Sequence, residues 1–148
     1  MRDRPVIGWR EWVGLPALLP VPIKAKIDSG ARSSAVHSFG TRRFTDGGAP
    51  WVEFSLHPLQ GHDRPAFPCR AQVIDERMVR SSNGEAELRL FIATEASLGA
   101  VRWPIELSLA DRDLMGFRML LGRAAIRRRF VIDPGRSFRL SPATMAPA

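Results

Sequence analysis

Between Val21 and Ile27, apolar residues (valine, isoleucine or alanine) occupy every second position, and proline and lysine fill the positions between them. Side chains on a β-strand point to opposite faces in turn, so this alternation predicts a strand with one buried face. The predicted strand ends at Asp28. Gly30 follows it, and glycine allows backbone conformations that other residues avoid. The pattern therefore places an acidic side chain on a tight turn at the end of a strand.

Most of the remaining chain consists of short apolar stretches separated by glycine, proline and asparagine, which is typical of a small β-barrel or β-sandwich. The one helix that we expect is Gly122–Arg129. We expect strands at residues 6–12, 24–28, 34–39, 51–56, 67–74, 77–80, 85–93, 103–109, 118–121, 130–133 and 137–140. The chain is therefore predicted to be mostly β with one short helix.

The segment Val79–Glu87 is predicted to form a β-hairpin, because Asn83 and Gly84 lie between two extended stretches. Asn-Gly is a strong hairpin signal, since both residues tolerate the positive φ angles of a tight turn. A second long connection, Leu56–Phe67, is rich in proline and glycine and is predicted to be a loop.

The composition fits one folded domain. Of the 148 residues, 45% are hydrophobic, enough to form a core. We expect the domain to span residues 1–140 and residues 141–148 to be a flexible tail, because the tail has no periodicity.

No apolar stretch is long enough to cross a membrane, and the first residues lack the apolar core of a signal peptide. Cys69 is the only cysteine, which fits a reducing cytoplasm.

The charge of the chain allows an acidic partner. The net charge is +7, and Lys24 and Lys26 are the only lysines among 22 basic residues. Arginine binds carboxylates and phosphates with two hydrogen bonds, so an acidic peptide or a nucleic acid is a candidate partner. The arginines are dispersed, however, and Arg127–Arg129 is their only run. An arginine-rich genome composition is therefore the simpler explanation for the high share of arginine among the basic residues.

Two motifs far apart in the chain resemble those of the retropepsin-like aspartic proteases: Asp28-Ser29-Gly30 after a predicted strand, and Leu120-Leu121-Gly122 within an apolar one. Asp-Ser-Gly alone is also an ordinary turn sequence. Longer segments are similar to a bacterial family of small retropepsin-like proteins that is often described as ATP-dependent zinc proteases. These segments are Ile7–Glu11, Lys26–Ala35, Val79–Gly84, and Leu120–Arg123 with Val131–Pro134.

This resemblance implies a small closed β-barrel of the retropepsin-like type and an aspartic peptidase that hydrolyses peptide bonds. Such chemistry needs two carboxylates that share a proton. The chain has one Asp-(Ser/Thr)-Gly, and the Asp-Gly sequence at Asp46 lacks the hydroxyl residue. The family pattern therefore implies a homodimer with Asp28 from each subunit. In this pattern Ser29 hydrogen-bonds across the two-fold axis, and Gly30 lets the two turns approach each other.

The resemblance also implies roles for residues around the turn. The hairpin would be the flap that closes over a substrate, with the loop Leu56–Phe67 as the rival flap. The expected substrate-binding or flap residues are Arg32, Arg80, Ser81, Ser82, Asn83 and Gly84, and the expected supporting residues are Leu120, Leu121, Gly122 and Arg123. Arg32 and Arg80 would meet a substrate carboxylate, although each also fits an ordinary surface arginine.

The common description of the family mentions zinc and ATP, but the residues favour neither cofactor. The candidate zinc ligands are His37, His57, His62 and Cys69, and they show neither His-Glu-x-x-His nor Cys-x-x-Cys spacing. The chain also lacks a Gly-x-x-x-x-Gly-Lys-(Ser/Thr) phosphate-binding loop. We therefore expect no metal site and no cofactor, and a zinc-dependent protease is a weaker alternative.

Two other functions stay open. A dimer of the same fold could bind peptides without cleaving them. A nucleic-acid-binding barrel would use the high pI and the tryptophans Trp9, Trp12, Trp51 and Trp103, but no aromatic–basic repeat follows one strand. The resemblance also implies an association with ATP-grasp ligases that add amino acids, commonly glutamate, to peptide ends. The expected substrate is therefore an acidic or glutamate-extended peptide.

Overall fold

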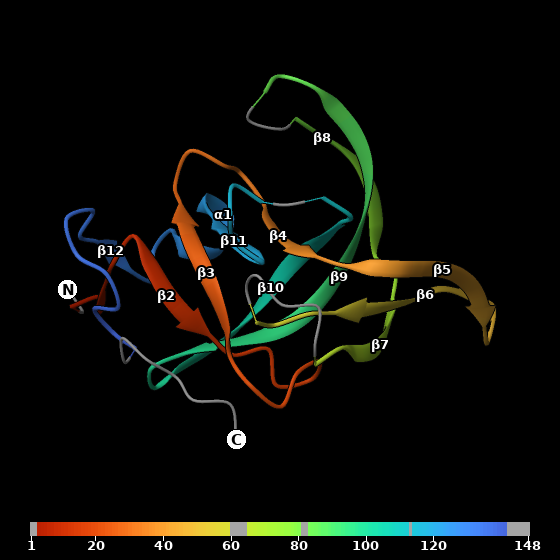
Figure 1. Ribbon diagram of the computed structural model, residues 1–148, viewed down its shortest axis with the longest axis horizontal. Helices are drawn as coiled ribbons and strands as arrows, with labels where there is room; N and C mark the ends of the chain where they lie inside the picture. Colours follow the sequence, from red (N-terminus) through yellow and green to blue (C-terminus); the bar gives the residue numbers. More distant parts are fainter. Residues whose placement is uncertain (1–2, 60–64, 81–82, 113, 142–148) are drawn as a thin grey trace.

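The computed structural model of the chain describes residues 3–59, 65–80, 83–112 and 114–141. The strands are β1 (Val6–Ile7), β2 (Arg10–Val13), β3 (Ile23–Asp28), β4 (Ser34–His37), β5 (Phe39–Asp46), β6 (Ala49–Leu56), β7 (Phe67–Gln72), β8 (Asp75–Arg80), β9 (Ala86–Leu98), β10 (Val101–Ala110), β11 (Met119–Gly122) and β12 (Val131–Ile132), and the helix is α1 (Arg123–Ile126). The chain is mostly β with one short helix, as predicted (Figure 1). No helix among the described residues has the length and apolar character needed to cross a membrane.

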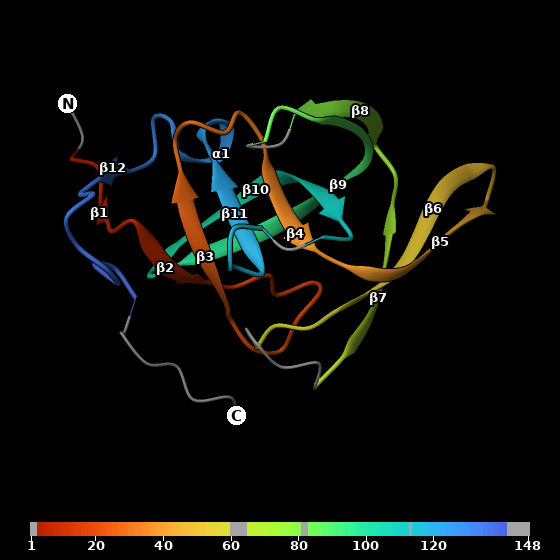
Figure 2. The same ribbon diagram turned by 45° about the horizontal axis from the view of Figure 1, so that its top comes forward.

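Seven strands form the main sheet, in the order β2-β3-β11-β4-β10-β9-β8 (Figures 1 and 2). The acidic turn joins β3 to β4, yet β11 lies between these two strands. It pairs in parallel with β3 and antiparallel with β4. A strand from the C-terminal part of the chain thus separates two strands that are consecutive in sequence. In this register Gly122 lies opposite Asp28.

One hydrophobic core joins the main sheet to a three-stranded sheet formed by β5, β6 and β7. In β3 the predicted alternation is present: Ile23, Ala25 and Ile27 are buried, and the residues between them are partly exposed. From the second sheet, Phe54 and Leu56 of β6 are buried in the same core. Burial of each large apolar side chain contributes about 1.5–3 kcal/mol to stability. The core therefore fixes the strands that carry the acidic turn.

The main sheet does not close into a barrel, so that part of the prediction is wrong. β2 and β8 are its two edges. Among the described residues, the chain next to β2 meets β9 at one bridge, where Gly14 and Ser97 exchange two backbone hydrogen bonds of 2.8 Å. At the other end of β9, residues Ala86–Phe91 pair with β8 and arch away from the body as a hairpin (Figure 1). The two edge strands do not pair with each other, so the sheet stays open.

Two of the predicted strand assignments differ from the structure in their extent. Residues Val6–Trp12 form two strands and not one, because another segment crosses at Gly8. A Cβ atom at Gly8 would lie 2.4 Å from the carbonyl oxygen of Arg136. Phe39–Asp46, where only the first residue was predicted to be strand, is a full strand that pairs with β6 in a projecting arm (Figure 1).

A buried carboxylate, not a strand, holds the segment after β12. Glu11 is fully buried, and its two oxygens accept hydrogen bonds of 2.6–3.2 Å from backbone N–H groups and one hydroxyl group. The donors are the N–H groups of Gly8, Arg139, Leu140 and Ser141 and the hydroxyl of Ser141. The strand predicted at 137–140 is absent, because the N–H groups of Arg139 and Leu140 point to this carboxylate. Ser141, the first residue of the predicted tail, is buried here, and residues 142–148 lie outside the described residues.

Candidate active site

The acidic turn begins at Asp28, the last residue of β3, whose side chain is partly exposed. Its Oδ1 accepts a hydrogen bond of 3.1 Å from the N–H of Gly30, and its carbonyl oxygen accepts one of 3.2 Å from the N–H of Ala31. Aspartate and glycine favour such turns, because the short carboxylate can bond to the backbone two residues further on. Among the described residues, the other oxygen, Oδ2, has no hydrogen-bond donor. One carboxylate oxygen is therefore fixed and the other is available.

Gly122 lies directly behind the turn. Its N–H donates a hydrogen bond of 3.0 Å to Oγ of Ser34. A Cβ atom at this position would lie 2.4 Å from the carbonyl oxygen of Ser33, much closer than such atoms approach in proteins. Because only glycine has no Cβ atom, only glycine permits this contact. The approach of β11 thus presses two backbones together beneath Asp28.

The helix α1 begins beside the turn and donates hydrogen bonds to it. The N–H of Arg123 donates to the carbonyl oxygen of Ala31 at 2.7 Å, and the N–H of Ala124 donates to that of Arg32 at 3.0 Å. The side chain of Arg123 donates from Nη1 to the carbonyl oxygen of Ser29 at 3.1 Å. The first N–H groups of a helix have no partner within the helix, so they are free to bind these carbonyl groups. The turn is therefore held from two sides.

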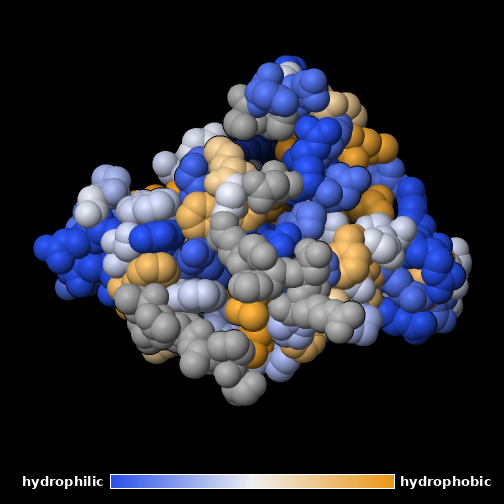
Figure 3. Space-filling model, in the orientation of Figure 1, coloured by the Kyte–Doolittle hydropathy of each residue, from blue (hydrophilic) through white to orange (hydrophobic). Residues whose placement is uncertain are grey.

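A cleft of about 1160 Å³ separates the acidic turn from the β8–β9 hairpin. Asp28 and Gly30 line one side, and Val79 and Arg80 of β8 line the other. In the space-filling view, both hydrophilic and hydrophobic side chains border the hollow under the hairpin (Figure 3). Ligand pockets are typically about 300–1,000 Å³, so this cleft has room for several residues of an extended peptide.

The structure brings many of the predicted site residues to this cleft. Those that line it are Asp28, Gly30, Arg32, Arg80 and Leu120. Those that lie behind or beside the turn are Ser29, Leu121, Gly122 and Arg123. Asn83 and Gly84 form the exposed turn of the hairpin, where Gly84 has a φ of +87°. Ser81 and Ser82 lie outside the described residues.

Three arginines that the sequence motifs did not single out also line the cleft: Arg77, Arg89 and Arg112. Arg77 is paired with Oε1 of Glu106 at 2.9 Å and with Oδ2 of Asp75 at 2.6 Å, and these hydrogen bonds raise the pKa of Arg77. Arg77 lies opposite Arg89 in the β8–β9 register. The predicted hairpin could not have paired these two residues, because its return strand begins at residue 85, whereas Arg80 pairs with Ala86 in the structure.

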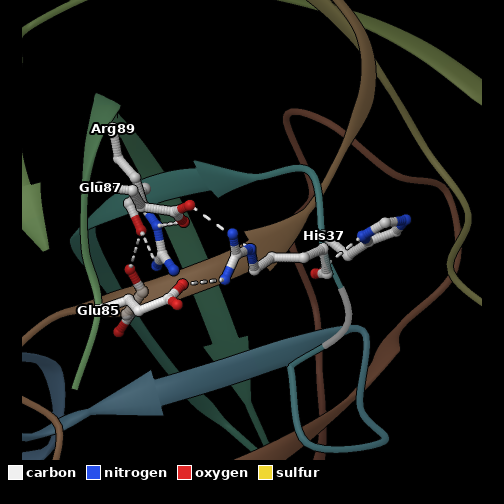
Figure 4. Close-up of polar contacts among 7 residues, drawn as sticks. His37, Glu85, Glu87 and Arg89 are labelled. Carbon is white, nitrogen blue, oxygen red and sulfur yellow. Dashed lines mark hydrogen bonds and ion pairs between the residues drawn. The ribbon is translucent and has the colours of Figure 1, made fainter. Parts of the chain in front are cut away.

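Arg89 connects the hairpin to the strand that follows the acidic turn. Its side chain is 7% exposed, and its Nε donates to Oε1 of Glu87 at 2.6 Å (Figure 4). Its Nη1 donates to Oγ of Ser108 at 3.4 Å, and that hydroxyl donates to the carbonyl oxygen of Ser34 at 3.1 Å. Buried charges need such partners, because burial without them is costly. The base of the hairpin is therefore tied to β4.

The histidine and cysteine residues considered as zinc ligands do not form a cluster among the described residues. The ring centroids of His37 and His57 lie 6.5 Å apart. The thiol of Cys69 donates to two backbone carbonyl oxygens at 3.5 Å, and burial raises its pKa to about 11. The thiolate form that binds a metal is therefore disfavoured. In the described ranges, no group of three or more histidine, cysteine or acidic side chains could hold a metal ion. His62 lies outside these ranges.

The four tryptophans make internal contacts in different parts of the fold. Trp103 is buried, with its ring centroid 5.0 Å from that of Phe130. The other three pairs are Trp9 with Phe117, Trp12 with Phe138, and Trp51 with Phe44. Trp12 belongs to the main sheet and Trp51 to the three-stranded sheet. They do not form the continuous row of aromatic side chains on which nucleic-acid bases stack.

Curated relatives of this chain are named probable alpha-L-glutamate ligase. The protein from Shewanella pealeana is 47% identical over 135 residues, which cover 91% of this chain and 30% of that protein. The protein from Parasynechococcus marenigrum is 41% identical over 140 residues, which cover 95% of this chain and 30% of that protein. The chain thus spans about 30% of the length of the curated relatives it matches.

A solved structure has a similar fold. It is the crystal structure of a protein of unknown function from Legionella pneumophila, with a TM-score of 0.73 and 21% sequence identity. The match covers 92% of this chain and 98% of that one. A family model described as the retropepsin-like aspartic endopeptidase RimB matches residues 6–142, nearly the whole chain. The chain therefore belongs to the RimB-like family of retropepsin-like aspartic endopeptidases.

Proposed function

We propose that this chain is an aspartic peptidase that works as a homodimer, with one Asp28 from each subunit at a shared site. The observation that carries the proposal is the placement of Asp28. It lies on a turn held by Gly122 and Arg123, at one side of a cleft of about 1160 Å³. Membership of a family of aspartic endopeptidases supports the same activity. A cytoplasmic location is part of the proposal.

The proposed reaction uses the two carboxylates in different protonation states. The ionised carboxylate accepts a proton from a water molecule, and the resulting hydroxide oxygen forms a bond to the carbonyl carbon of the scissile peptide. The other carboxyl group is protonated and donates its proton to the leaving nitrogen as the carbon–nitrogen bond breaks. Two carboxylates a few ångströms apart cannot both ionise easily, which is how one proton comes to be shared. We assign this pair to Asp28 and to Asp28 of the partner subunit.

The proposed substrate is an acidic peptide, in particular one extended with glutamate by an ATP-grasp ligase. The relatives that are named probable alpha-L-glutamate ligase support this functional link. Arg32 is exposed at the cleft, and its side chain has no ion pair among the described residues. Arg80 donates one hydrogen bond of 2.7 Å to the carbonyl oxygen of Gly84 and retains other donors. Both guanidinium groups suit a substrate carboxylate.

The activity is tested with Asp28→Asn, which keeps the size of the side chain and removes its acid–base chemistry. Cleavage of a glutamate-extended peptide should fall by about 10³-fold or more between about pH 4 and 8. Asp46→Asn, at the exposed β5–β6 turn, is the matched control and should retain full activity. A metal chelator should have no effect on the wild type. Full activity in Asp28→Asn would disprove the mechanism, and peptide binding without cleavage by the wild type would favour an inactive peptide-binding dimer.

The shared site is tested by mixing equal amounts of the wild type and Asp28→Asn and allowing the subunits to exchange. If each site needs both aspartates, only wild-type dimers cleave, and activity should settle near a quarter of that of the same total amount of wild type. Independent sites in each subunit would instead retain about half. Sedimentation of the wild type as a monomer under assay conditions would also contradict the proposal.

A further inference from the structure

Arg112 follows β10, and its guanidinium lines the same cleft as Asp28. Two glutamates of the hairpin face it (Figure 4). Its Nε lies 3.5 Å from Oε2 of Glu87, and its Nη1 lies 3.9 Å from Oε2 of Glu85. The side chain of Arg112 is 48% exposed. Both ion pairs are longer than a charge-assisted hydrogen bond, which is typically about 2.7–2.9 Å.

The other arginines of the cleft that have ion pairs are held much more tightly. Arg89 is almost fully buried and lies 2.6 Å from Glu87, and Arg77 lies 2.6 Å from Asp75. These short contacts make Arg77 and Arg89 parts of the hairpin structure. Arg112 differs, because exposed ion pairs with long distances contribute little to stability. Its carboxylate partners can therefore be exchanged at low cost.

The backbone of Arg112 is anchored although its side chain is not. Nδ1 of His37 lies 3.1 Å from the carbonyl oxygen of Arg112 (Figure 4). A carbonyl oxygen only accepts hydrogen bonds, so this ring nitrogen is the donor. His37 ends β4, the strand that follows the acidic turn. The backbone of Arg112 is thus bonded to the strand that follows the turn, while its guanidinium group makes only long ion pairs.

Glu85 and Glu87 present two carboxylates with one residue between them, in a chain that is extended from Ala86 onward. Side chains two residues apart in an extended chain lie on the same face, about 7 Å apart. An extended peptide with acidic residues presents carboxylates with the same spacing. The hairpin thus offers Arg112 the same chemical groups as the proposed substrate does.

We propose that Arg112 is a specificity-determining residue that binds an acidic side chain of the substrate, and that Glu85 and Glu87 hold its guanidinium group while the cleft is empty. This inference rests on the proposed function, because it assumes an acidic peptide in the cleft. A substrate carboxylate displaces the long contact to Glu85 and forms a shorter, charge-assisted hydrogen bond in its place. Glu87 stays bound to Arg89 during this exchange.

The inference is tested by peptide binding to protein that carries Asp28→Asn, so that cleavage does not interfere. The probes are a fluorescent oligoglutamate peptide and the oligoglutamine peptide of the same length. Adding Arg112→Gln should raise the Kd of the glutamate peptide roughly tenfold, the size expected for one hydrogen bond to a charged group. Binding of the glutamine peptide should not change. Adding Glu85→Gln should instead tighten binding of the glutamate peptide, because the competing carboxylate is gone.

The matched control is Arg102→Gln. Arg102 is an exposed arginine of β10 with a long ion pair, 3.9 Å from Glu95, and it does not line the described part of the cleft. The substitution Arg102→Gln removes the same charge as Arg112→Gln does, and it should leave the binding of both peptides nearly unchanged. Equal weakening by Arg112→Gln and Arg102→Gln would overturn the inference, because net charge alone would then explain the effect.

Three further outcomes are informative. Equal loss of both peptides in Arg112→Gln would overturn the inference, because Arg112 would then support only the hairpin. Absence of glutamate-peptide binding by the Asp28→Asn protein would also overturn it. Binding that depends on Arg112, together with no cleavage by the wild type, would uphold the role of Arg112 and remove only the proposed peptidase activity.

Discussion

The two sides of the cleft are built differently. The floor, formed by β3, β4 and β11 with the acidic turn, is held by backbone hydrogen bonds and by the backbone contact at Gly122. The roof, formed by the β8–β9 hairpin, has an almost fully exposed strand β8, which is an edge strand and pairs only with β9 among the described strands. Catalytic groups need fixed positions, whereas a cover must open and close. If the hairpin is the proposed flap, we expect the floor to be rigid and the roof to move.

The largest expected difference concerns two methionines, one on each side of the cleft. Met119 of β11 is fully buried in the floor, and Met78 of β8 is 63% exposed in the roof. Met119→Ala should lower the free energy of unfolding by about 2–5 kcal/mol, because it leaves a cavity in the core. Met78→Ala should change it by less than about 0.5 kcal/mol. Urea unfolding at equal protein concentration measures both, and similar losses would contradict the comparison.

A smaller effect on the free energy of unfolding is expected at Gly122, where the floor has no room for one more carbon atom. Gly122→Ala should lower the free energy of unfolding by about 3 kcal/mol, because the nearest atoms belong to the backbone and cannot move aside. The control is Gly135→Ala, whose new Cβ atom would meet only a side-chain oxygen at 3.5 Å. A fully stable Gly122→Ala variant would show that β11 can shift away from the turn.

The smallest of the three stability effects concerns glutamates in two environments. Glu11, next to the floor, is buried and binds backbone donors, whereas Glu95 is 47% exposed and lies 3.9 Å from Arg102. Glu11→Gln should lower the free energy of unfolding by about 2 kcal/mol near neutral pH, because its amide nitrogen would face N–H donors. Glu95→Gln should change it by less than about 0.5 kcal/mol.

The effect of Glu11 should depend on pH. Burial opposes ionisation of the carboxyl group, but the hydrogen bonds from Gly8, Ser141 and Leu140 outweigh it and hold the pKa of Glu11 below its ordinary value of 4.5. The ionised form is thus favoured in the folded state, so its contribution is complete above pH 4.5 and decreases as pH falls below that value. The difference in free energy of unfolding between the wild type and Glu11→Gln should therefore become smaller in acid. A gap that widens in acid would contradict this assignment.

The alternation of apolar residues correctly predicted β3, and Asn83-Gly84 correctly predicted a hairpin between β8 and β9. Local signals sufficed, because side-chain period and turn chemistry depend on neighbouring residues. The closed barrel was wrong for a long-range reason, since β8 pairs only with Ala86–Phe91 of β9 and the chain next to β2 meets β9 at a single bridge among the described residues. The strand at 137–140 was wrong for a similar reason, because the N–H groups of Arg139 and Leu140 bind Glu11 from the other end of the chain.

The residues of the candidate site also divide into those with a local sequence signal and those without one. Asp28, Gly30 and Gly122 could be identified from their motifs, because each motif is short and has its own turn chemistry. Arg112 could not be identified, since its partners Glu85 and Glu87 come from a hairpin that is far away in the sequence. In Asp111-Arg112-Asp113 the local sequence shows only an ordinary charged loop.

The sequence by itself thus determined the mostly β character, the acidic turn and the hairpin, because these depend on periodicity and on residues that are adjacent in the chain. Only the tertiary structure decided that β11 lies between β3 and β4, that the sheet stays open, and that Arg112 lines the cleft with Asp28. These features depend on which distant segments pack together. That choice follows from the summed packing and hydrogen bonding of the whole chain, which no local pattern encodes.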